Sequence, residues 1–259
     1  MKVVKLGGSV ITYKHLPLMP RYNAIDRLCK EIADSNEKEL IVVHGGGSFG
    51  HYYASKWYPK GRNDKESRLL IAKTQNAMQK LNRIIVERLI NAKISAISLQ
   101  TSAMLISENG EIKKFNLEII EDMLAKGIVP VLYGDVVFDT KQGFSIISGD
   151  TISCFLAKKL DAEKLIFCCD VDGVYDKDPK KCKDAKLLKE VNLREISIRQ
   201  DEPRKPSNAY FDVTGSFFGK LMRLKRYRLG CECLIINGLK RNSLRLAISC
   251  RRVGTLVTW

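Results

Sequence analysis

The order of apolar and polar positions along the chain predicts alternating strands and helices. Short β-branched runs bounded by glycine or polar residues are typical of buried strands, whereas apolar residues spaced three and four apart mark one face of a helix. The chain begins strand, glycine turn, helix, strand, glycine loop, an order that favours an α/β fold with a parallel sheet. The predicted strands are Lys2–Leu6, Glu39–Val43, Ile94–Leu99, Ile128–Tyr133, Ala162–Cys169, Leu234–Ile236 and Gly254–Thr258.

Six helices are predicted between these strands. In the first, apolar residues recur at Ala24, Ile25, Leu28, Cys29 and Ile32, the spacing of one buried face. The remaining helices follow from the same spacing in longer windows. The six are Arg21–Ala33, Leu69–Asn91, Leu117–Lys126, Ser148–Leu160, Phe217–Leu229 and Asn242–Ser249.

Hairpins and loops interrupt this alternation in four places. Ala103–Lys113 and Val136–Ile147 each carry a polar, glycine-containing turn between apolar residues, which indicates antiparallel hairpins. Trp57–Ser67 is polar and irregular, so we expect a flap or insertion. Arg199–Asn208 contains two prolines and is expected to be a mobile loop.

The stretch His44–His51 carries the strongest chemical signal. It reads His-Gly-Gly-Gly-Ser-Phe-Gly-His directly after a strand. Three consecutive glycines supply no side chain, so we do not expect them to serve packing. They allow backbone N–H groups to approach an anion such as a phosphate, although an ordinary strand-to-helix turn is the alternative. His51 is then a candidate ligand for that anion. His44 is expected to be structural, and His15 to lie on the surface.

Lys5–Ser9, Lys-Leu-Gly-Gly-Ser, forms a second glycine turn at a strand end. The Lys5 ammonium would be placed to hold the outer phosphates of a nucleotide, with the Gly7 and Gly8 amides on oxygens of the transferred group. The sequence matches neither the G-x-x-x-x-G-K-[ST] nor the G-x-G-x-x-G phosphate loop. A purely structural turn is the alternative reading.

Four further polar residues have two readings each. Lys220 lies in a basic helix, and on its own it would be read as an ordinary solvated lysine. Asp150 is an N-cap or first-turn acid of its helix, while Asp170 and Asp172 follow a strand end. These carboxylates either cap and close turns or orient lysines and waters around Mg²⁺.

Composition narrows the class of protein. The chain has 259 residues, 45% of them hydrophobic and 28% charged, as in a soluble globular protein. No apolar run reaches the roughly 18–20 residues of a membrane span, and Met1–Lys5 already reads as a strand, so we expect a cytoplasmic protein without membrane attachment. Eight cysteines form no Cys-x-x-Cys pair and no zinc spacing with the three histidines, which predicts free thiols.

The formal net charge of +15 is spread along the chain without a recognised nucleic-acid motif. We therefore expect phosphate-bearing small molecules, and not nucleic acid, as ligands. A basic nucleic-acid or effector-binding module without catalytic activity is the non-enzyme alternative.

Taken together, the motifs resemble the amino acid kinase family in order and spacing over essentially the whole chain. The loop Gly-Ser-Phe-Gly-His and Lys14 are similar to those of the isopentenyl phosphate kinase branch, and the fosfomycin kinase branch is similar at His51. The motifs that carry the resemblance are Lys5–Ser9, His44–Gly47, Ser148–Asp150, Asp170–Tyr175, Asp212–Gly215 with Lys220, and Val253–Thr255.

The resemblance implies an open αβα sandwich with a mainly parallel central sheet, commonly as a homodimer. In this single structural domain, residues 1–148 would form the acceptor-binding lobe and residues 149–259 the ATP-binding lobe. The implied activity is ATP-dependent, in-line phosphorylation of isopentenyl phosphate to isopentenyl diphosphate, in isoprenoid biosynthesis. A kinase of another small phosphate or phosphonate and a nucleoside monophosphate kinase are alternatives. Mg²⁺ would arrive with ATP, without an assigned side-chain ligand.

The resemblance also implies roles for single residues. Lys5 and Lys220 would neutralise the transferring phosphoryl group, Lys14 would stabilise the transition state, and Asp150 would orient the lysines. The acceptor-binding residues would be Gly45, Gly46, His51 and Gly149. The ATP-binding residues would be Lys5, Leu6, Gly7, Gly8, Ser9, Gly47, Asp170, Asp172, Gly173, Val174, Tyr175, Asp178, Pro179, Lys180, Gly215, Ser216 and Lys220.

One position departs from the family pattern. The usual Thr-Gly-Gly-Met before the lysine is Thr-Gly-Ser-Phe here, with Ser216 in place of a glycine that approaches ATP. Lys220 keeps its spacing. A C5 tail on the acceptor would need an apolar pocket, expected from Ala77, Met78 and Ile85 with neighbouring strands.

Overall fold

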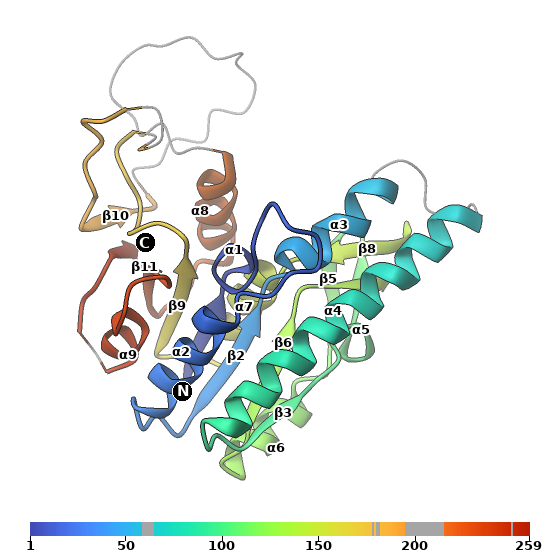
Figure 1. Cartoon of the computed structure of the whole chain (residues 1–259), viewed down its shortest axis with the longest axis horizontal. Coiled ribbons are helices and arrows are strands. Elements are labelled where there is room, and N and C mark those ends of the chain that lie inside the picture. The colour runs from blue at the N-terminus through green and yellow to red at the C-terminus, as the bar shows by residue number, and fades with distance from the viewer. Residues whose placement is uncertain (59–64, 178, 180–181, 195–214, 250) are drawn as a thin grey trace.

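The central element is a twisted sheet whose strand order differs from the chain order (Figure 1). The computed structural model describes residues 1–58, 65–177, 179, 182–194, 215–249 and 251–259. Within this part of the chain, eight strands form the sheet, and every neighbouring pair is parallel except β11–β12. In order across the sheet the strands are β10 (Glu190–Asn192), β12 (Thr255–Thr258), β11 (Glu232–Asn237), β9 (Lys164–Cys169), β1 (Lys2–Leu6), β2 (Leu40–His44), β6 (Val129–Tyr133) and β3 (Ala96–Ser98).

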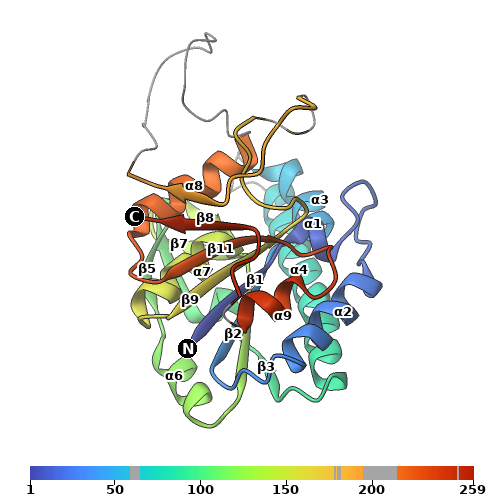
Figure 2. The ribbon, with the colours of Figure 1, turned by 90° about the vertical axis from the view of Figure 1, so that its left-hand side faces the viewer.

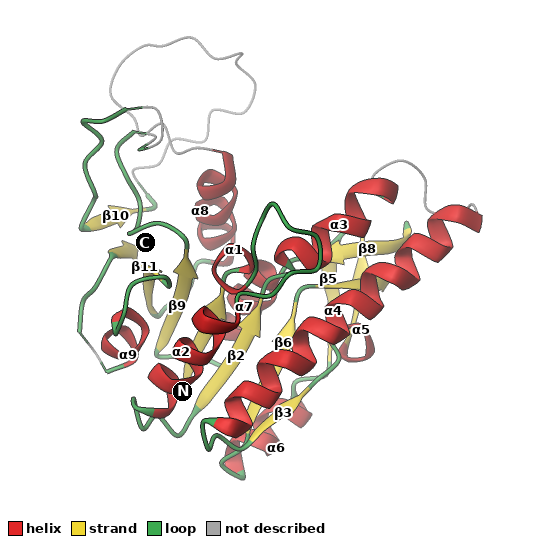
Figure 3. Ribbon diagram, in the orientation of Figure 1, coloured by secondary structure: helices red, strands yellow, loops and turns green. Residues whose placement is uncertain are grey.

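Helices cover both faces of the sheet (Figures 2 and 3). One apolar core packs α1 (Gly8–Ile11), α2 (Tyr22–Ala33), α3 (Gly47–Trp57), α4 (Lys65–Asn91) and α9 (Ser243–Ile248) on one face. A second core packs α5 (Thr101–Met104), α6 (Glu118–Ala125), α7 (Gly149–Lys159) and α8 (Gly215–Tyr227) on the other. β1, β2 and β9 are buried at every position, as expected of parallel strands covered on both faces.

A smaller sheet lies beside the second core. Four strands of the described chain form it, in the order β5 (Glu111–Phe115), β4 (Leu105–Glu108), β7 (Asp135–Asp139) and β8 (Gly143–Ile147). The Asp139 carboxylate fastens its two turns together, because it accepts N–H hydrogen bonds from Asn109, Gly110, Lys141 and Gln142. Because β4 pairs antiparallel with β5, and β7 with β8, both predicted hairpins are confirmed.

The predicted strands and six helices are present, with corrections around residue 60. Trp57 does not open an irregular flap: it is the last residue of α3, it is buried, and its indole N–H donates to Thr74 Oγ1 at 3.0 Å. α4 begins at Lys65, four residues before the predicted start at Leu69. α3 itself was missed, because two glycines lower its helix propensity and its stability comes from packing on α4. The predicted loop 199–208 lies outside the described residues.

Two expectations drawn from composition concern the cysteines and membrane-spanning helices. The seven cysteines that the structure describes are all unpaired, and five of them are buried. Cys250 lies outside the described residues. No helix of the described chain is long and apolar enough to cross a membrane.

Candidate active site

The candidate site lies where the central strands end. The carboxyl ends of parallel strands meet at one edge of a sheet, and ligands of open α/β sheets bind there. Leu6 of β1 lies opposite His44 of β2 and Cys168 of β9, so the residues that follow these three strands meet at the same level. The two glycine loops and Asp170 are thereby brought together, as the sequence predicted.

The glycines at this edge do serve packing, which corrects the prediction from sequence. A Cβ atom on Gly8 would lie 2.3 Å from the Gly47 nitrogen, and one on Gly149 would lie 2.7 Å from the His44 carbonyl oxygen. Gly47 also has φ of +49°, a left-handed backbone that favours glycine. Gly46 lies against Met78 of α4, since an added Cβ would come within 3.0 Å of the Met78 sulfur. The two loops can touch only because they lack side chains.

The backbone amides at this edge divide into two groups. Gly7 N–H donates to Cys168 O and Gly45 N–H to Leu6 O, each at 2.9 Å, so these two amides extend the sheet and do not face a ligand. By contrast, the N–H groups of Gly8, Gly47 and Gly149, the first residues of α1, α3 and α7, donate to no acceptor within the described chain. N–H groups in the first turn of a helix have no intrahelical acceptor. An anion bound at this edge would therefore accept hydrogen bonds from the N–H groups of Gly8, Gly47 and Gly149.

Two lysines and one aspartate form the buried centre of the site. Successive side chains of a strand point to opposite faces of the sheet. Val4 and Leu6 of β1 belong to the first apolar core, so Lys5 between them points to the other face, which α7 and α8 cover. Its ammonium lies 2.8 Å from Asp150 Oδ1, and the Lys220 ammonium lies 2.6 Å from Asp150 Oδ2. Lys5 and Lys220 are 8% and 6% exposed. The structure thus brings together residues from three distant parts of the chain.

Charge pairing outweighs burial in this cluster. Burial by itself would raise the pKa of Asp150, but the charges of Lys220 and Lys5 hold that pKa well below its ordinary value. Burial by itself would lower the pKa of Lys220, but Asp150 makes the net shift upward. Asp150 lies in the first turn of α7, whose N-cap is Ser148. Asp150 and Lys220 therefore stay charged at neutral pH.

A second, more exposed pair adjoins the first. Asp170 Oδ2 lies 2.8 Å from the Lys14 ammonium, and its Oδ1 accepts from Ser9 Oγ at 2.9 Å. The Lys14 side chain is 52% exposed and that of Asp170 29%. Burial by itself would raise the pKa of Asp170, but the hydrogen bonds from Lys14 and Ser9 outweigh it and lower the pKa. Lys14 is therefore held at the rim of the site.

A third pair joins Asp172, which the sequence predicted as a site residue, to two residues at and after the end of β11 that sequence reasoning missed. Asn237 Nδ2 donates to Asp172 Oδ1 at 2.7 Å, and the Lys240 ammonium lies 2.8 Å from Asp172 Oδ2. These contacts lower the pKa of Asp172. The Asn-Gly pair that ends β11 was the only signal in the sequence. Gly173 follows Asp172, and a Cβ on it would lie 2.3 Å from Thr255 Oγ1, which accepts from Val174 N–H.

The three histidines lie in different environments. His44 is fully buried, with Nδ1 3.1 Å from Gly45 O and Nε2 3.2 Å from Asn82 Oδ1. Burial lowers the pKa of His44 to about 4, so the ring is neutral and structural, as predicted. His15 is exposed, also as predicted. His51 lies exposed in the second turn of α3, on the helix that the glycine loop opens.

Five of the predicted ATP-binding residues lie in or next to segments outside the described residues. Asp178 and Lys180 lie outside the described residues, and Pro179 is an exposed turn residue between them. Gly215 and Ser216 begin α8, and the Ser216 side chain lies outside what the structure describes.

Comparison with known proteins assigns the chain to a family. The model of the amino acid kinase family matches residues 1–224. The chain belongs to the amino acid kinase family. It is 36% identical over 269 residues to the isopentenyl phosphate kinase of Methanothermobacter thermautotrophicus, covering 100% of this chain and 99% of that protein. It is 33% identical to the isopentenyl phosphate kinase of Methanocaldococcus jannaschii, covering 98% and 97%.

The fold agrees with this assignment. A solved isopentenyl phosphate kinase structure superimposes with a TM-score of 0.85 at 32% identity, covering 100% of both chains. The predicted family and the predicted α/β fold with a mainly parallel sheet are therefore confirmed. In this member of the amino acid kinase family, the buried centre consists of Lys5, Asp150 and Lys220.

Proposed function

We propose that the chain is a kinase that transfers the γ-phosphoryl group of ATP to the phosphate of isopentenyl phosphate, which gives isopentenyl diphosphate and ADP. The observation that carries this proposal is the buried pairing of Lys5 and Lys220 with Asp150 at the edge where the glycine loops meet. Full-length similarity to isopentenyl phosphate kinases supports the choice of acceptor.

The chemical difficulty of this reaction is electrostatic. A phosphate oxygen of the acceptor is already a competent nucleophile near neutral pH, so no strong general base is needed. The two reactants are both anions, and their repulsion increases as water is excluded. Catalysis then consists of positioning and of positive charge placed where the phosphoryl group passes.

The residues at the edge meet these needs in three ways. Lys5 and Lys220 neutralise the transferring group, while Asp150 holds their ammonium groups apart and in place. The free amides of Gly8, Gly47 and Gly149 contact phosphate oxygens along its path. Because the lysines are already fixed by Asp150, little reorganisation accompanies transfer.

The acceptor is bound on the α3 side of the edge. His51 donates to the phosphate of isopentenyl phosphate, and Lys14 stabilises the transition state from the rim. The five-carbon tail extends toward α4. Ala77, Met78 and Ile85 are buried there in the apolar core, and Met78 reaches the glycine loop. Residues 1–148 thus serve the acceptor, and residues 149–259 serve ATP.

We propose that Mg²⁺ arrives on ATP and takes no ligand from these carboxylates. The carboxylates of Asp150, Asp170 and Asp172 all have their oxygens engaged by lysine, serine or asparagine groups. Within the part of the chain that the structure describes, no group of three His, Cys, Asp or Glu residues is placed to hold a metal ion. When bound with ATP, Mg²⁺ would add charge neutralisation at the triphosphate.

The decisive experiment compares acceptors. A coupled ADP-release assay with isopentenyl phosphate, fosfomycin and uridine monophosphate is expected to give turnover with isopentenyl phosphate. Preference for either other acceptor would reassign the enzyme to that branch. Salt-sensitive RNA binding without ATP turnover would instead indicate a non-catalytic module.

A His51→Ala variant tests the acceptor contact. Removal of one such donor typically lowers the rate on the order of 10²–10³-fold. His15→Ala, an exposed histidine away from the glycine loops, is the matched control and is expected to retain normal turnover. Near-normal turnover and acceptor KM in His51→Ala would contradict the assignment.

Assembly and location are separate parts of the proposal. We infer a cytoplasmic homodimer in isoprenoid biosynthesis, and light scattering of the purified chain tests the dimer directly. A monomer at micromolar concentration would contradict it.

A further inference from the structure

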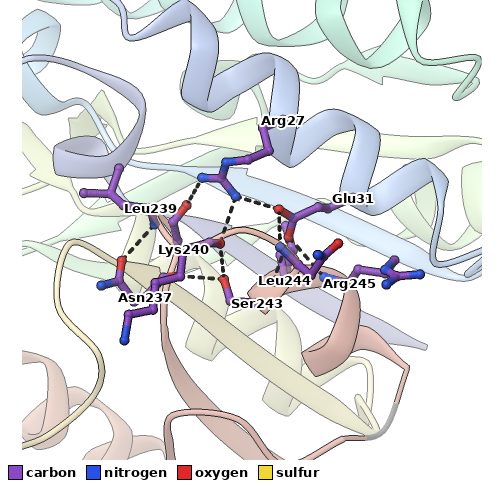
Figure 4. A network of polar contacts seen from close by, with 10 residues as sticks. Arg27, Glu31, Asn237, Leu239, Lys240, Ser243, Leu244 and Arg245 are labelled. Atoms are coloured by element: carbon purple, nitrogen blue, oxygen red, sulfur yellow. Dashed lines mark hydrogen bonds and ion pairs between the residues drawn. The ribbon is translucent and has the colours of Figure 1, made fainter.

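A buried carboxylate on α2 caps a helix from far away in the sequence. Glu31 is 4% exposed. Its Oε1 accepts from Asn242 N–H at 2.9 Å, and its Oε2 accepts from Leu244 N–H at 2.9 Å and from Arg245 N–H at 3.3 Å (Figure 4). Asn242 makes no capping hydrogen bond with its own side chain and has φ of +62°, a left-handed backbone. The start of α9 therefore depends on Glu31.

Arg27, one turn earlier on α2, fixes the preceding loop. Its Nη1 lies 2.6 Å from Glu31 Oε1 and donates to Lys240 O at 3.0 Å. Its Nη2 donates to Gly238 O. Two α2 side chains thus satisfy five backbone groups between residues 238 and 245. Such directional contacts fix a loop conformation, whereas a buried ion pair adds little net stability over an apolar pair.

The loop held in this way carries the partners of Asp172. Asn237 directs its Nδ2 to Asp172 and accepts Leu239 N–H at 2.8 Å with its Oδ1, while Lys240 supplies the second contact to Asp172. Gly238 lies against Val10 of α1, since a Cβ there would come within 3.0 Å of a Val10 methyl group. The loop therefore lies between α2 and the strand ends where ATP is proposed to bind.

We propose that the Arg27–Glu31 pair positions the donor side of the site. It fixes the loop 238–242, and through Asn237 and Lys240 it fixes Asp172 and the donor-binding segment Gly173–Tyr175. Arg27 and Glu31 are positioning residues, because their contacts are with protein groups. The inference rests on the proposed ATP site and adds α2, from the acceptor lobe, as a determinant of ATP affinity.

The test measures ATP binding apart from turnover. Glu31→Gln keeps the size of the side chain but loses the charge, and its amide N–H groups oppose those of α9. Because hydrogen bonds to a charged group are stronger than those to a neutral one, we expect the Kd for Mg-ATP by calorimetry and the ATP KM to rise about tenfold. The acceptor KM and kcat are expected to change less than about twofold. Lys30→Met, which breaks an exposed ion pair on the same helix, is the matched control and should leave all four unchanged.

Two further variants protect the test against unfolding. Arg27→Lys keeps the charge but loses the forked donors to Gly238 O and Lys240 O, and we expect the same selective rise in the ATP constants. Lys240→Met removes the far end of the path. If the path is shared, Glu31→Gln with Lys240→Met will bind ATP no more weakly than the worse single variant.

Three outcomes would overturn the inference. The first is a lower Tm with an unchanged ATP Kd in Glu31→Gln and Arg27→Lys, which would make the pair merely structural. The second is full additivity of Glu31→Gln and Lys240→Met. The third is a wild-type chain that binds no ATP. A wild-type chain that binds ATP but does not phosphorylate isopentenyl phosphate would refute the proposed acceptor alone, because the calorimetric test does not use it.

Discussion

Two aspartates at the same edge of the structure have opposite electrostatic environments. Asp150 follows Gly149 in α7, and Asp135 follows Gly134 at the start of β7. The two glycines touch, since a Cβ on Gly134 would lie 2.7 Å from the Gly149 nitrogen. Asp150 pairs with two lysines, whereas Asp135, 1% exposed, receives a 2.8 Å hydrogen bond from Val136 N–H and has no partner for Oδ2 among the described residues.

The difference shows how neighbouring side chains decide the charge of a buried carboxyl group. Burial raises the pKa of Asp135 to about 7, because the hydrogen bond from Val136 N–H offsets only part of the desolvation. The lysines around Asp150 reverse the sign of that shift. Asp150 is a permanent negative charge that organises the centre, and Asp135 is protonated below neutral pH.

Asp150→Asn is expected to cause the largest loss of stability. Removal of one partner from a buried ion pair typically costs about 3–5 kcal/mol, and here it leaves two buried ammonium groups without a counter-charge. Because the native pKa of Asp150 lies below its unfolded value of about 3.9, this stabilisation is present above pH 4 and is lost as the pH falls below it. Urea unfolding at pH 7 and pH 3 checks both the size and the sign. Asp122→Asn, on the exposed face of α6, is the control. An equal effect at both pH values would contradict the pairing.

Lys220→Met separates catalysis from this electrostatic support. Lys5 remains paired with Asp150, so the fold is retained while one cation on the phosphoryl path is lost. We expect kcat to fall on the order of 10²–10³-fold. Steady-state kinetics with Lys159→Met as the control measure the effect, since Lys159 is exposed on α7. Unchanged kcat would place phosphoryl transfer elsewhere.

The elements of the centre could be found from sequence because each lies in a short local motif. Lys5 precedes a glycine turn, Asp150 follows Ser148-Gly149, and the family pattern fixes the spacing of Lys220. Contacts between residues that are distant in the sequence could not be found in this way. Gly8 packs on Gly47, a residue 39 positions away in the sequence. The space beside each glycine, which the sequence suggested was open to a ligand, is therefore partly occupied by the other glycine.

The donor-side support was invisible for the same physical reason. Glu31 and Leu244 are 213 positions apart, and Glu31 resembles any other acid on a helix until the tertiary fold buries it. α3 was missed because its glycines are poor helix formers, while packing on α4 decides its structure. The periodicity of apolar residues shows which face of a helix is buried, but it does not show which element packs against that face.

Asp135→Asn tests the protonation of Asp135 through the pH dependence of stability. Between about pH 4 and 7 the native state holds a proton on Asp135 that the unfolded state has lost. Stability therefore falls as pH rises through this window, by up to about 1.4 kcal/mol per pH unit, and levels off above it. The asparagine variant cannot ionise, so this part of the decline should disappear. Unfolding at pH 5, 6 and 8, beside Asp122→Asn, measures the slope. Parallel curves for wild type and Asp135→Asn would show that Asp135 is charged throughout.

Lys14→Met gives the smallest stability effect and tests the rim against the centre. The Lys14–Asp170 pair is half exposed, so solvent and salt screen it, and we expect unfolding to change by less than about 1 kcal/mol. If Lys14 nevertheless stabilises the transition state, kcat should fall about tenfold, or about 1.4 kcal/mol, while the Tm stays within the error of the Lys30→Met control. The reverse result, a lower Tm with unchanged kcat, would show that the Lys14 ion pair only stabilises the packing of the loop before α2 against the end of β9. Rim and centre would then differ in function as well as in burial, with transfer resting on the two lysines that Asp150 holds.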